Sequence, residues 1–276
     1  MAILTSIHEK ARYVAPYEWL VNHNIQEWDL EKANISILRS LDIISEEEYL
    51  NYYNMPRQQR EVALGCLRRD NPRIEEGYRQ GIKAARQLFF DANSLEEENV
   101  LYIDNDSITT VHQWKDPRAG HLVGKLSPYI NFRVKRRYTS FYQLFAIDFL
   151  YYSDGTTEEF RLKNVDDSRL RQNHTGYFLD FILAAAFSAQ NNPILDSIQL
   201  VRDTYNSYAT KSLDIEYYRE LNPMNKYKMM NSQYYTFYSD NLSEAEKEYV
   251  DISYNASIIR LFYRIFMKEY FRQVKR

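Results

Sequence analysis

Residues 100–110 hold the sequence feature that most limits how this chain can fold. Two runs of apolar and β-favouring residues flank the polar tip Asp104-Asn105-Asp106, a pattern that predicts a β-hairpin with a tight turn. Because side chains alternate along a strand, Asp104 and Asp106 should lie on one side of the hairpin. Two carboxylates that close repel each other unless a divalent cation lies between them. An ordinary hairpin turn explains the same residues, since Asp and Asn favour turns.

The segment before this hairpin supplies a third carboxylate. Residues 1–25 have an amphipathic pattern that predicts a helix, and a short strand through Trp28 and Asp29 is expected to turn into a second helix. Asp29 then has two interpretations. It is either the N-cap of that helix or a carboxylate that is free for chemistry.

Residues 45–90 are expected to form short helices. Ser45-Glu-Glu-Glu48 is a capping signal for the first of them, and breaks are expected near Pro56 and at Asp70-Asn-Pro72. The last helix should run from about residue 73 to residue 90.

This last helix carries three cations that should share one face, because Arg79, Lys83 and Arg86 are separated by four and three residues. A cationic helix face is usually solvated. The alternative is a clamp in which these side chains meet the oxygens of a triphosphate.

The rest of the chain changes from strands to helices. Residues 130–137, 141–152 and 159–163 are expected to be strands, with a hairpin turn at 153–156. Residues 178–187 predict a buried helix, and a last helix should begin near residues 243–246. In this helix, basic residues recur every four positions: Arg260, Arg264, Lys268, Arg272 and Arg276. They form either a solvated face or a row of contacts for a nucleic-acid backbone.

Composition narrows the class of protein. The 276 residues are 45% hydrophobic, enough for a substantial core, and include only 7 Gly and 7 Pro, which disfavours a long linker. No apolar run is long enough to span a membrane, no charged leader precedes an apolar core, and the single Cys66 excludes an internal disulfide. We therefore expect a cytoplasmic protein without membrane attachment. The net charge of −3 does not decide whether it binds nucleic acid.

Four stretches, in order, resemble the palm motifs of family B DNA polymerases. The third, Tyr102-Ile-Asp-Asn-Asp-Ser107, is similar to the Tyr-Gly-Asp-Thr-Asp-Ser motif of that family. The other three are similar to the first palm motif, the fingers helix and the basic run that touches primer-template: Asp29-Leu-Glu-Lys-Ala-Asn34-Ile-Ser-Ile37, Lys83-Ala-Ala-Arg-Gln-Leu-Phe-Phe-Asp91 and Lys135-Arg136-Arg137-Tyr138. They span about residues 25–140.

The resemblance implies an α+β fold. An antiparallel palm-like sheet with packed helices would fill residues 1–165, with short fingers-like helices at about 45–90. A mainly helical thumb-like or accessory region would fill residues 166–276. The small size suits a protein encoded by a phage or mobile element.

The resemblance also implies a function, template-directed nucleotidyl transfer with two Mg²⁺ or Mn²⁺ ions. Asp29, Asp104 and Asp106 would be the catalytic, metal-binding residues. Nucleoside triphosphates would be held by Arg79, Lys83 and Asn34, and a DNA or RNA primer-template by Lys135, Arg136, Arg137 and Tyr138.

This chain departs from the family pattern. No room precedes Asp29 for a proofreading exonuclease domain, Asn34 replaces the Tyr that checks the sugar, and the residues after Lys83 are all changed. A protein partner could supply missing polymerase parts. The alternative function is a non-catalytic palm-derived protein that binds nucleic acid or builds an assembly.

Overall fold

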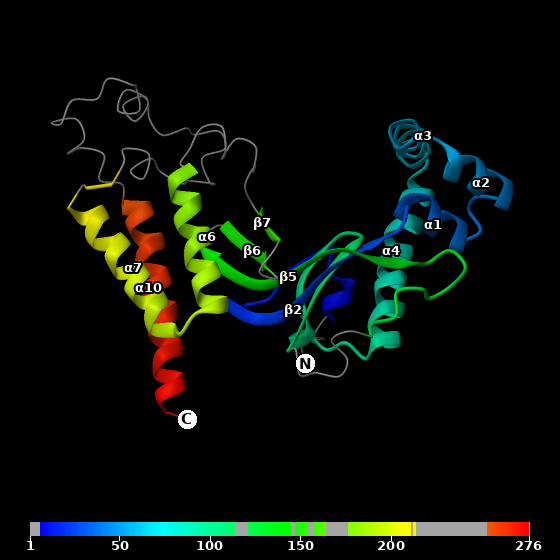
Figure 1. The fold of residues 1–276 in the computed structure, drawn as a ribbon. Coiled ribbons are helices and arrows are strands. Elements are labelled where there is room, and N and C mark those ends of the chain that lie inside the picture. The colour runs from blue at the N-terminus through cyan, green and yellow to red at the C-terminus, as the bar shows by residue number, and fades with distance from the viewer. Residues whose placement is uncertain are drawn as a thin grey trace, which may run out of the picture. The chain divides into compact units, whose positions relative to one another are not determined.

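The computed structural model describes residues 6–113, 121–144, 147–153, 157–163, 176–210, 212–213 and 253–275. The described strands form one antiparallel sheet in the order β1-β3-β4-β2-β5-β6-β7, accompanied by helices (Figure 1). The mixed α+β class, the antiparallel sheet and the helical C-terminal part are thus confirmed. Contacts divide the chain into two compact units, 1–17 with 23–137 and 18–22 with 138–276. The expected boundary after residue 165 lies outside the described residues.

The first unit holds the hairpin and the helices that follow Asp29. Its elements are η1 Ile7–Glu9, β1 Arg12–Val14, β2 Trp19–Leu30 from His23 onward, α1 Ala33–Ser40, α2 Glu46–Asn54, α3 Arg57–Asp70, α4 Pro72–Asn93, η2 Glu97–Asn99, β3 Val100–Asp104, β4 Ser107–Gln113 and β5 Phe132–Leu144 up to Arg137. The rings of Trp28 and Phe132 both contact Phe89 of α4, with centroids 5.3 and 4.8 Å away.

The helix expected over residues 1–25 is wrong. In the described part of this segment, β1 pairs antiparallel with β3, and β2 pairs with β4 over His23 to Asp29. Pairing with strands about ninety residues later in the chain overrides the local amphipathic pattern, because β-structure depends on its neighbours more than on local propensity. This pairing carries Asp29 to the hairpin.

The helix boundaries follow the capping residues. The Ser45 side chain accepts a hydrogen bond from Glu48 N, and Glu48 returns one to Ser45 N, so the expected capping box starts α2. Asn71 caps α4, with Pro72 in the first turn. The expected breaks at Pro56 and residues 70–72 are confirmed, and α4 continues three residues beyond Phe90.

The second unit is a helical cluster with a small part of the sheet. Its elements are Glu18–Asn22 of β2, the end of β5 from Tyr138, β6 Ile147–Ser153, β7 Glu158–Lys163, α6 Gly176–Asn191, α7 Ile194–Ala209 and α10 Ser253–Val274. The three helices run side by side (Figure 1). Their core includes Tyr142, Phe181, Ile182, Phe262 and Phe266. The start expected for the last helix near residue 243 and the tip of the turn at 154–156 lie outside the described residues.

The basic stripe of α10 is largely engaged within its own unit. Lys268 Nζ lies 2.7 Å from a Glu18 carboxylate oxygen, and Arg264 lies 4.0 Å from the other. Arg272 pairs with Glu269, and Arg260 donates to the Tyr205 hydroxyl at 2.7 Å. Arg276 lies outside the described residues. Within the described ranges, no helix has the length and apolarity that crossing a membrane requires.

Gly124 should be intolerant of any side chain. A Cβ atom there would lie 1.9 Å from the carbonyl oxygen of Phe132, whose N–H donates to Gly124 O at 2.9 Å. Because backbone must shift to relieve this clash, Gly124→Ala should lower the free energy of unfolding by about 2–4 kcal/mol in urea denaturation.

Gly65 is the matched control. It lies in α3, and an added Cβ meets nothing within 4 Å. Gly65→Ala should therefore raise the free energy of unfolding by about 0.5–1 kcal/mol, the difference in helix propensity. Equal effects of the two substitutions would show that the close approach at Gly124 is not tight.

Candidate functional site

The expected hairpin is present at residues 100–113. Asp104 pairs with Ser107 and Ile103 with Ile108, so Asn105 and Asp106 form the two-residue loop. Asn105 has a φ of 52°, a left-handed conformation that Asn tolerates better than most residues. The loop sequence therefore fits the backbone that the turn requires.

A buried arginine holds this loop from α4. Arg86 is 1% exposed and donates Nε to His8 O at 2.7 Å and Nη1 to Asn105 O at 2.5 Å. Burial lowers the pKa of the Arg86 guanidinium, and the negative charge of Asp106 raises it. The expected solvated face shared by Arg79, Lys83 and Arg86 is thus wrong for Arg86, because tertiary packing buries it.

The end of β2 brings Asp29 to the loop. Asp29 is the register partner of Ser107, and the next residue, Leu30, donates its N–H to Asp106 O at 3.0 Å. A carboxylate oxygen of Asp29 lies 3.3 Å from Lys135 Nζ on β5. The N-cap of α1 is Lys32, so the capping interpretation of Asp29 is wrong.

Asp106 is the carboxylate with the most unusual surroundings. Burial is the largest cause that raises its pKa, and the charges of Asp29 and Asp104 add to the rise, whereas its own backbone N–H and the charge of Lys135 lower the pKa. No described cation forms an ion pair with it. Asp104 is more open, with a side chain 55% exposed and 3.5 Å from Arg12. The three predicted carboxylates therefore interact electrostatically, and Asp106 is the least compensated.

Side chains of α3 and α4 form the surroundings of Asp106 on the helical side. Burial raises the pKa of Tyr78 to about 12, with Arg68 opposing this rise and Asp106 adding to it. The Arg68 guanidinium lies over the Tyr78 ring, 3.7 Å from its centroid. The sequence does not single out Tyr78 or Arg68, since neither belongs to a motif that stands out by spacing.

Asn34, expected near the sugar of a nucleotide, is tied to α3. Its Nδ2 donates to Glu61 at 2.6 Å, and its Oδ1 accepts from Arg68 Nη1 at 2.6 Å. Arg68 also contacts Glu75 at 2.7 Å, and Glu75 pairs with Arg79 at 2.9 Å. A polar network thus joins Asn34 to Arg79.

The remaining predicted residues differ in accessibility. Lys83 is half-buried and makes no hydrogen bond or ion pair with any described residue. Lys135 is held at Asp29, whereas Arg136 and Arg137 are exposed. Tyr138 is buried and belongs to the second unit.

The carboxylate oxygens near the hairpin loop suit a hard divalent cation, but the described side chains are not arranged to hold one. Carboxylate oxygens are the ligands that Mg²⁺ and Mn²⁺ prefer, and no described cation forms an ion pair with Asp106. Among the described residues, no three His, Cys, Asp or Glu side chains adopt a metal-holding arrangement. One carboxylate oxygen of Asp29 is paired with Lys135, which would compete with an ion for that oxygen.

Asp106→Asn should stabilise the metal-free protein at neutral pH. The raised pKa means that the folded chain binds more protons than the unfolded chain between about pH 4, the ordinary carboxyl range, and the folded-state pKa. Wild-type stability therefore falls as pH rises through this window and stays lower above it. Asn removes the effect, so urea denaturation in EDTA should show a gain at pH 7 that shrinks towards pH 4. A gain that is larger at pH 4 would contradict the assigned surroundings of Asp106.

Comparison with known proteins gives a family for the chain. A comparison with curated proteins finds no match. The family model described as "Bacteriophage PBS1 gene 130 protein" matches residues 2–268. Since this match extends over nearly the whole sequence, the chain belongs to the bacteriophage PBS1 gene 130 protein family.

Proposed function

We propose that this phage-family protein is a minimal template-directed nucleotidyltransferase that resembles a polymerase palm. One observation carries the proposal. Burial raises the pKa of Asp106, and the charges of Asp104 and of Asp29, which strand pairing brings from more than seventy residues earlier in the chain, add to the rise. Perturbed carboxylates that interact in this way are typical of functional sites.

Asp29 and Asp106 would hold Mg²⁺ or Mn²⁺, with Asp104 as a weaker ligand. When bound, such ions lower the pKa of an attacking hydroxyl and neutralise charge on a pyrophosphate leaving group. Asp106 is the strongest candidate ligand, because no described cation forms an ion pair with it. A cation there would offset both the cost of burying its charge and its repulsion from the other two carboxylates.

The other residues would position substrates. Lys83, which has no described partner, would meet the phosphates of a nucleoside triphosphate, with Arg79 nearby on the same helix. The Asn34 amide would lie near the sugar, oriented by Arg68 and Glu61. The exposed Arg136 and Arg137 would contact the backbone of a DNA or RNA template. Positioning and charge stabilisation would supply most of the rate enhancement.

A second function is favoured by the ion pairs of the site. Lys135 at Asp29 and Arg12 at Asp104 already compensate two of the three carboxylates. Such pairing suits a non-catalytic protein that retains the palm-like arrangement and binds nucleic acid or builds an assembly.

A primer-extension assay separates the two proposed functions. It measures extension of a labelled primer-template in Mg²⁺ or Mn²⁺ and compares deoxy- with ribonucleotides. Metal-dependent extension supports the nucleotidyltransferase, and the nucleotide comparison reports on Asn34. The assay is repeated with host or phage lysate added to supply a partner. Binding of primer-template without extension, even then, supports the non-catalytic function. If the protein neither binds nor extends the primer-template, both proposed functions are overturned.

A further inference from the structure

A pocket of about 290 Å³ lies in the first unit, between α2 and the segment before β5. Three tyrosines line it, Tyr49, Tyr53 and Tyr129, together with polar side chains that include Glu31, Lys125 and Asn131. The volume is close to the lower limit for small-molecule sites, which combine apolar and aromatic lining residues with polar groups, as this pocket does. None of the predicted catalytic carboxylates lines it.

The tyrosine wall is held by helix geometry. Tyr49 and Tyr53 lie one turn apart on α2, with ring centroids 5.8 Å apart. Tyr129 meets Tyr49 from the other side, at 5.2 Å and an interplanar angle of 70°. The Ser45–Glu48 capping box fixes the first turn of α2, from which Tyr49 follows directly.

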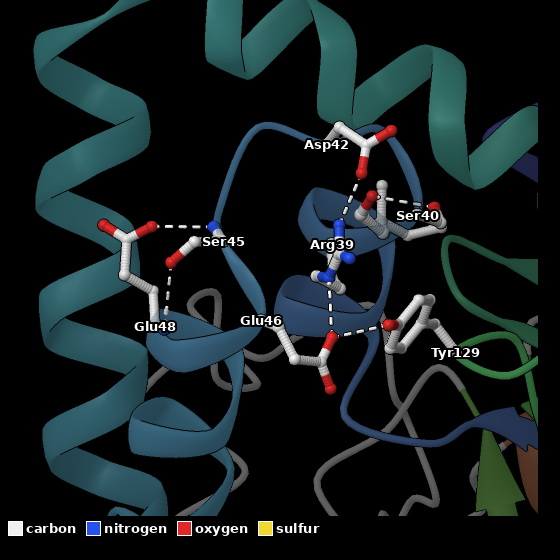
Figure 2. A network of polar contacts seen from close by, with 8 residues as sticks. Arg39, Ser40, Asp42, Ser45, Glu46, Glu48 and Tyr129 are labelled. Carbon is white, nitrogen blue, oxygen red and sulfur yellow. Dashed lines mark hydrogen bonds and ion pairs between the residues drawn. The ribbon is translucent and has the colours of Figure 1, made fainter.

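A polar network fixes the third tyrosine (Figure 2). The Tyr129 hydroxyl donates to Glu46 at 2.5 Å, and Glu46 in turn accepts from Arg39 Nε at 2.9 Å. The Arg39 guanidinium lies 4.9 Å from the centroid of the Tyr129 ring and also pairs with Asp42. Three contacts thus orient one aromatic side chain of the pocket, so the wall is preorganised.

One cation lines this pocket, and another lies against one of its tyrosines. Lys32 Nζ lies 2.9 Å from the centroid of the Tyr53 ring and donates to Tyr53 O at 2.8 Å. Burial lowers the pKa of Lys32, and the positive charges of Arg60 and Arg133 lower it further, whereas the negative charge of Glu31 raises it. Lys125 lines the pocket itself.

The acid at the pocket is already compensated. Glu31 accepts from Asn131 Nδ2 at 2.9 Å and lies 3.6 Å from Arg133. The surplus charge is therefore positive, which disfavours a cationic ligand and favours one that carries a phosphate. The tyrosine faces favour a planar aromatic group, because every nucleobase has a face that stacks on an aromatic ring.

We propose that this tyrosine pocket binds one unpaired nucleobase, with the attached phosphate near Lys32 and Lys125. The base comes either from a free nucleotide or from a single strand of nucleic acid, which share this chemistry. The proposal rests on the contacts of the pocket and does not require the catalytic role of Asp106.

The test is the affinity of the full chain for a fluorescein-labelled single-stranded dT12, measured by fluorescence anisotropy beside an otherwise equal strand of abasic sites. The wild type should bind dT12 about tenfold or more tightly than the abasic strand, since the phosphates are the same. Tyr53→Ala should remove most of this difference. Tyr53 is 39% exposed, so the variant should fold, and circular dichroism checks this.

Two controls keep the result specific. Tyr263→Ala removes a tyrosine of similar exposure, 42%, in the second unit, and should leave the preference for dT12 unchanged. Binding is measured in EDTA and without nucleoside triphosphates, which separates a failure of the pocket from a failure of the catalytic proposal. Displacement of dT12 by thymidine monophosphate would identify a free nucleotide as sufficient, and displacement only by unlabelled dT12 would identify a strand.

Equal affinity of the wild type for dT12 and the abasic strand would overturn the proposal. So would a preference for dT12 that survives in folded Tyr53→Ala.

Discussion

Asp106→Asn is expected to reduce primer extension by at least about a hundred- to a thousandfold while the protein remains folded. Asn keeps the shape of the side chain and removes its charge. The charge matters because Asp106 is half-buried, lacks a described ion-pair partner and repels Asp29 and Asp104. Loss of one preorganised charged group at a developing charge typically costs this factor in rate. Single-turnover extension measures the effect on the chemical step.

Asp104→Asn is the matched control for that prediction. It lies in the same hairpin, but its side chain is 55% exposed and lies 3.5 Å from Arg12. Solvent and Arg12 already compensate its charge, so the rate should fall less than in Asp106→Asn. Undiminished extension by a folded Asp106→Asn protein would remove Asp106 from the proposed role, and equal losses in both variants would remove the distinction between them.

Arg86→Met is expected to have the largest effect on stability, a loss of about 3–5 kcal/mol in the free energy of unfolding. Met fills much of the same space but cannot donate to the carbonyl oxygens of His8 and Asn105, at 2.7 and 2.5 Å. Both hydrogen bonds are part-buried, and a buried acceptor left without a donor costs about 1–3 kcal/mol. Urea denaturation followed by tryptophan fluorescence measures the loss, because Trp28 contacts Phe89 of the same helix.

Arg79→Met provides the control on the same helix. The Arg79 side chain is 66% exposed, and its pair with Glu75 lies at the surface, where such pairs contribute little. Its free energy of unfolding should stay within about 0.5 kcal/mol of the wild type. If Arg86→Met were equally mild, Arg86 would not be the residue that holds the hairpin loop.

The local signals of the sequence predicted local structure well. The hairpin followed from a polar tip between two β-favouring runs, and the capping box at Ser45 and the Asn71-Pro72 start of α4 followed from side chains that satisfy the first backbone N–H groups of a helix. These features depend on neighbours within a few residues. The spacing of residues along the sequence is therefore enough to predict them.

Features that depend on distant partners were not predictable in the same way. The pairing of β2 with β4 replaced an expected helix, and burial removed Arg86 from a face that helical spacing assigns to solvent. Tyr138 ends a basic run that suggests a surface, yet it is buried. The partners of Asn34 lie on α3, and Arg68 is 34 residues away. In each case tertiary contacts decide what the local pattern leaves open.

Anomalous X-ray diffraction from crystals grown with Mn²⁺ would show whether Asp29 and Asp106 form a divalent-cation site. We expect an anomalous peak in contact with both carboxylates, with Lys135 moved away from Asp29. Crystals with the Asp29–Lys135 pair intact and no anomalous peak at Asp106 would contradict it.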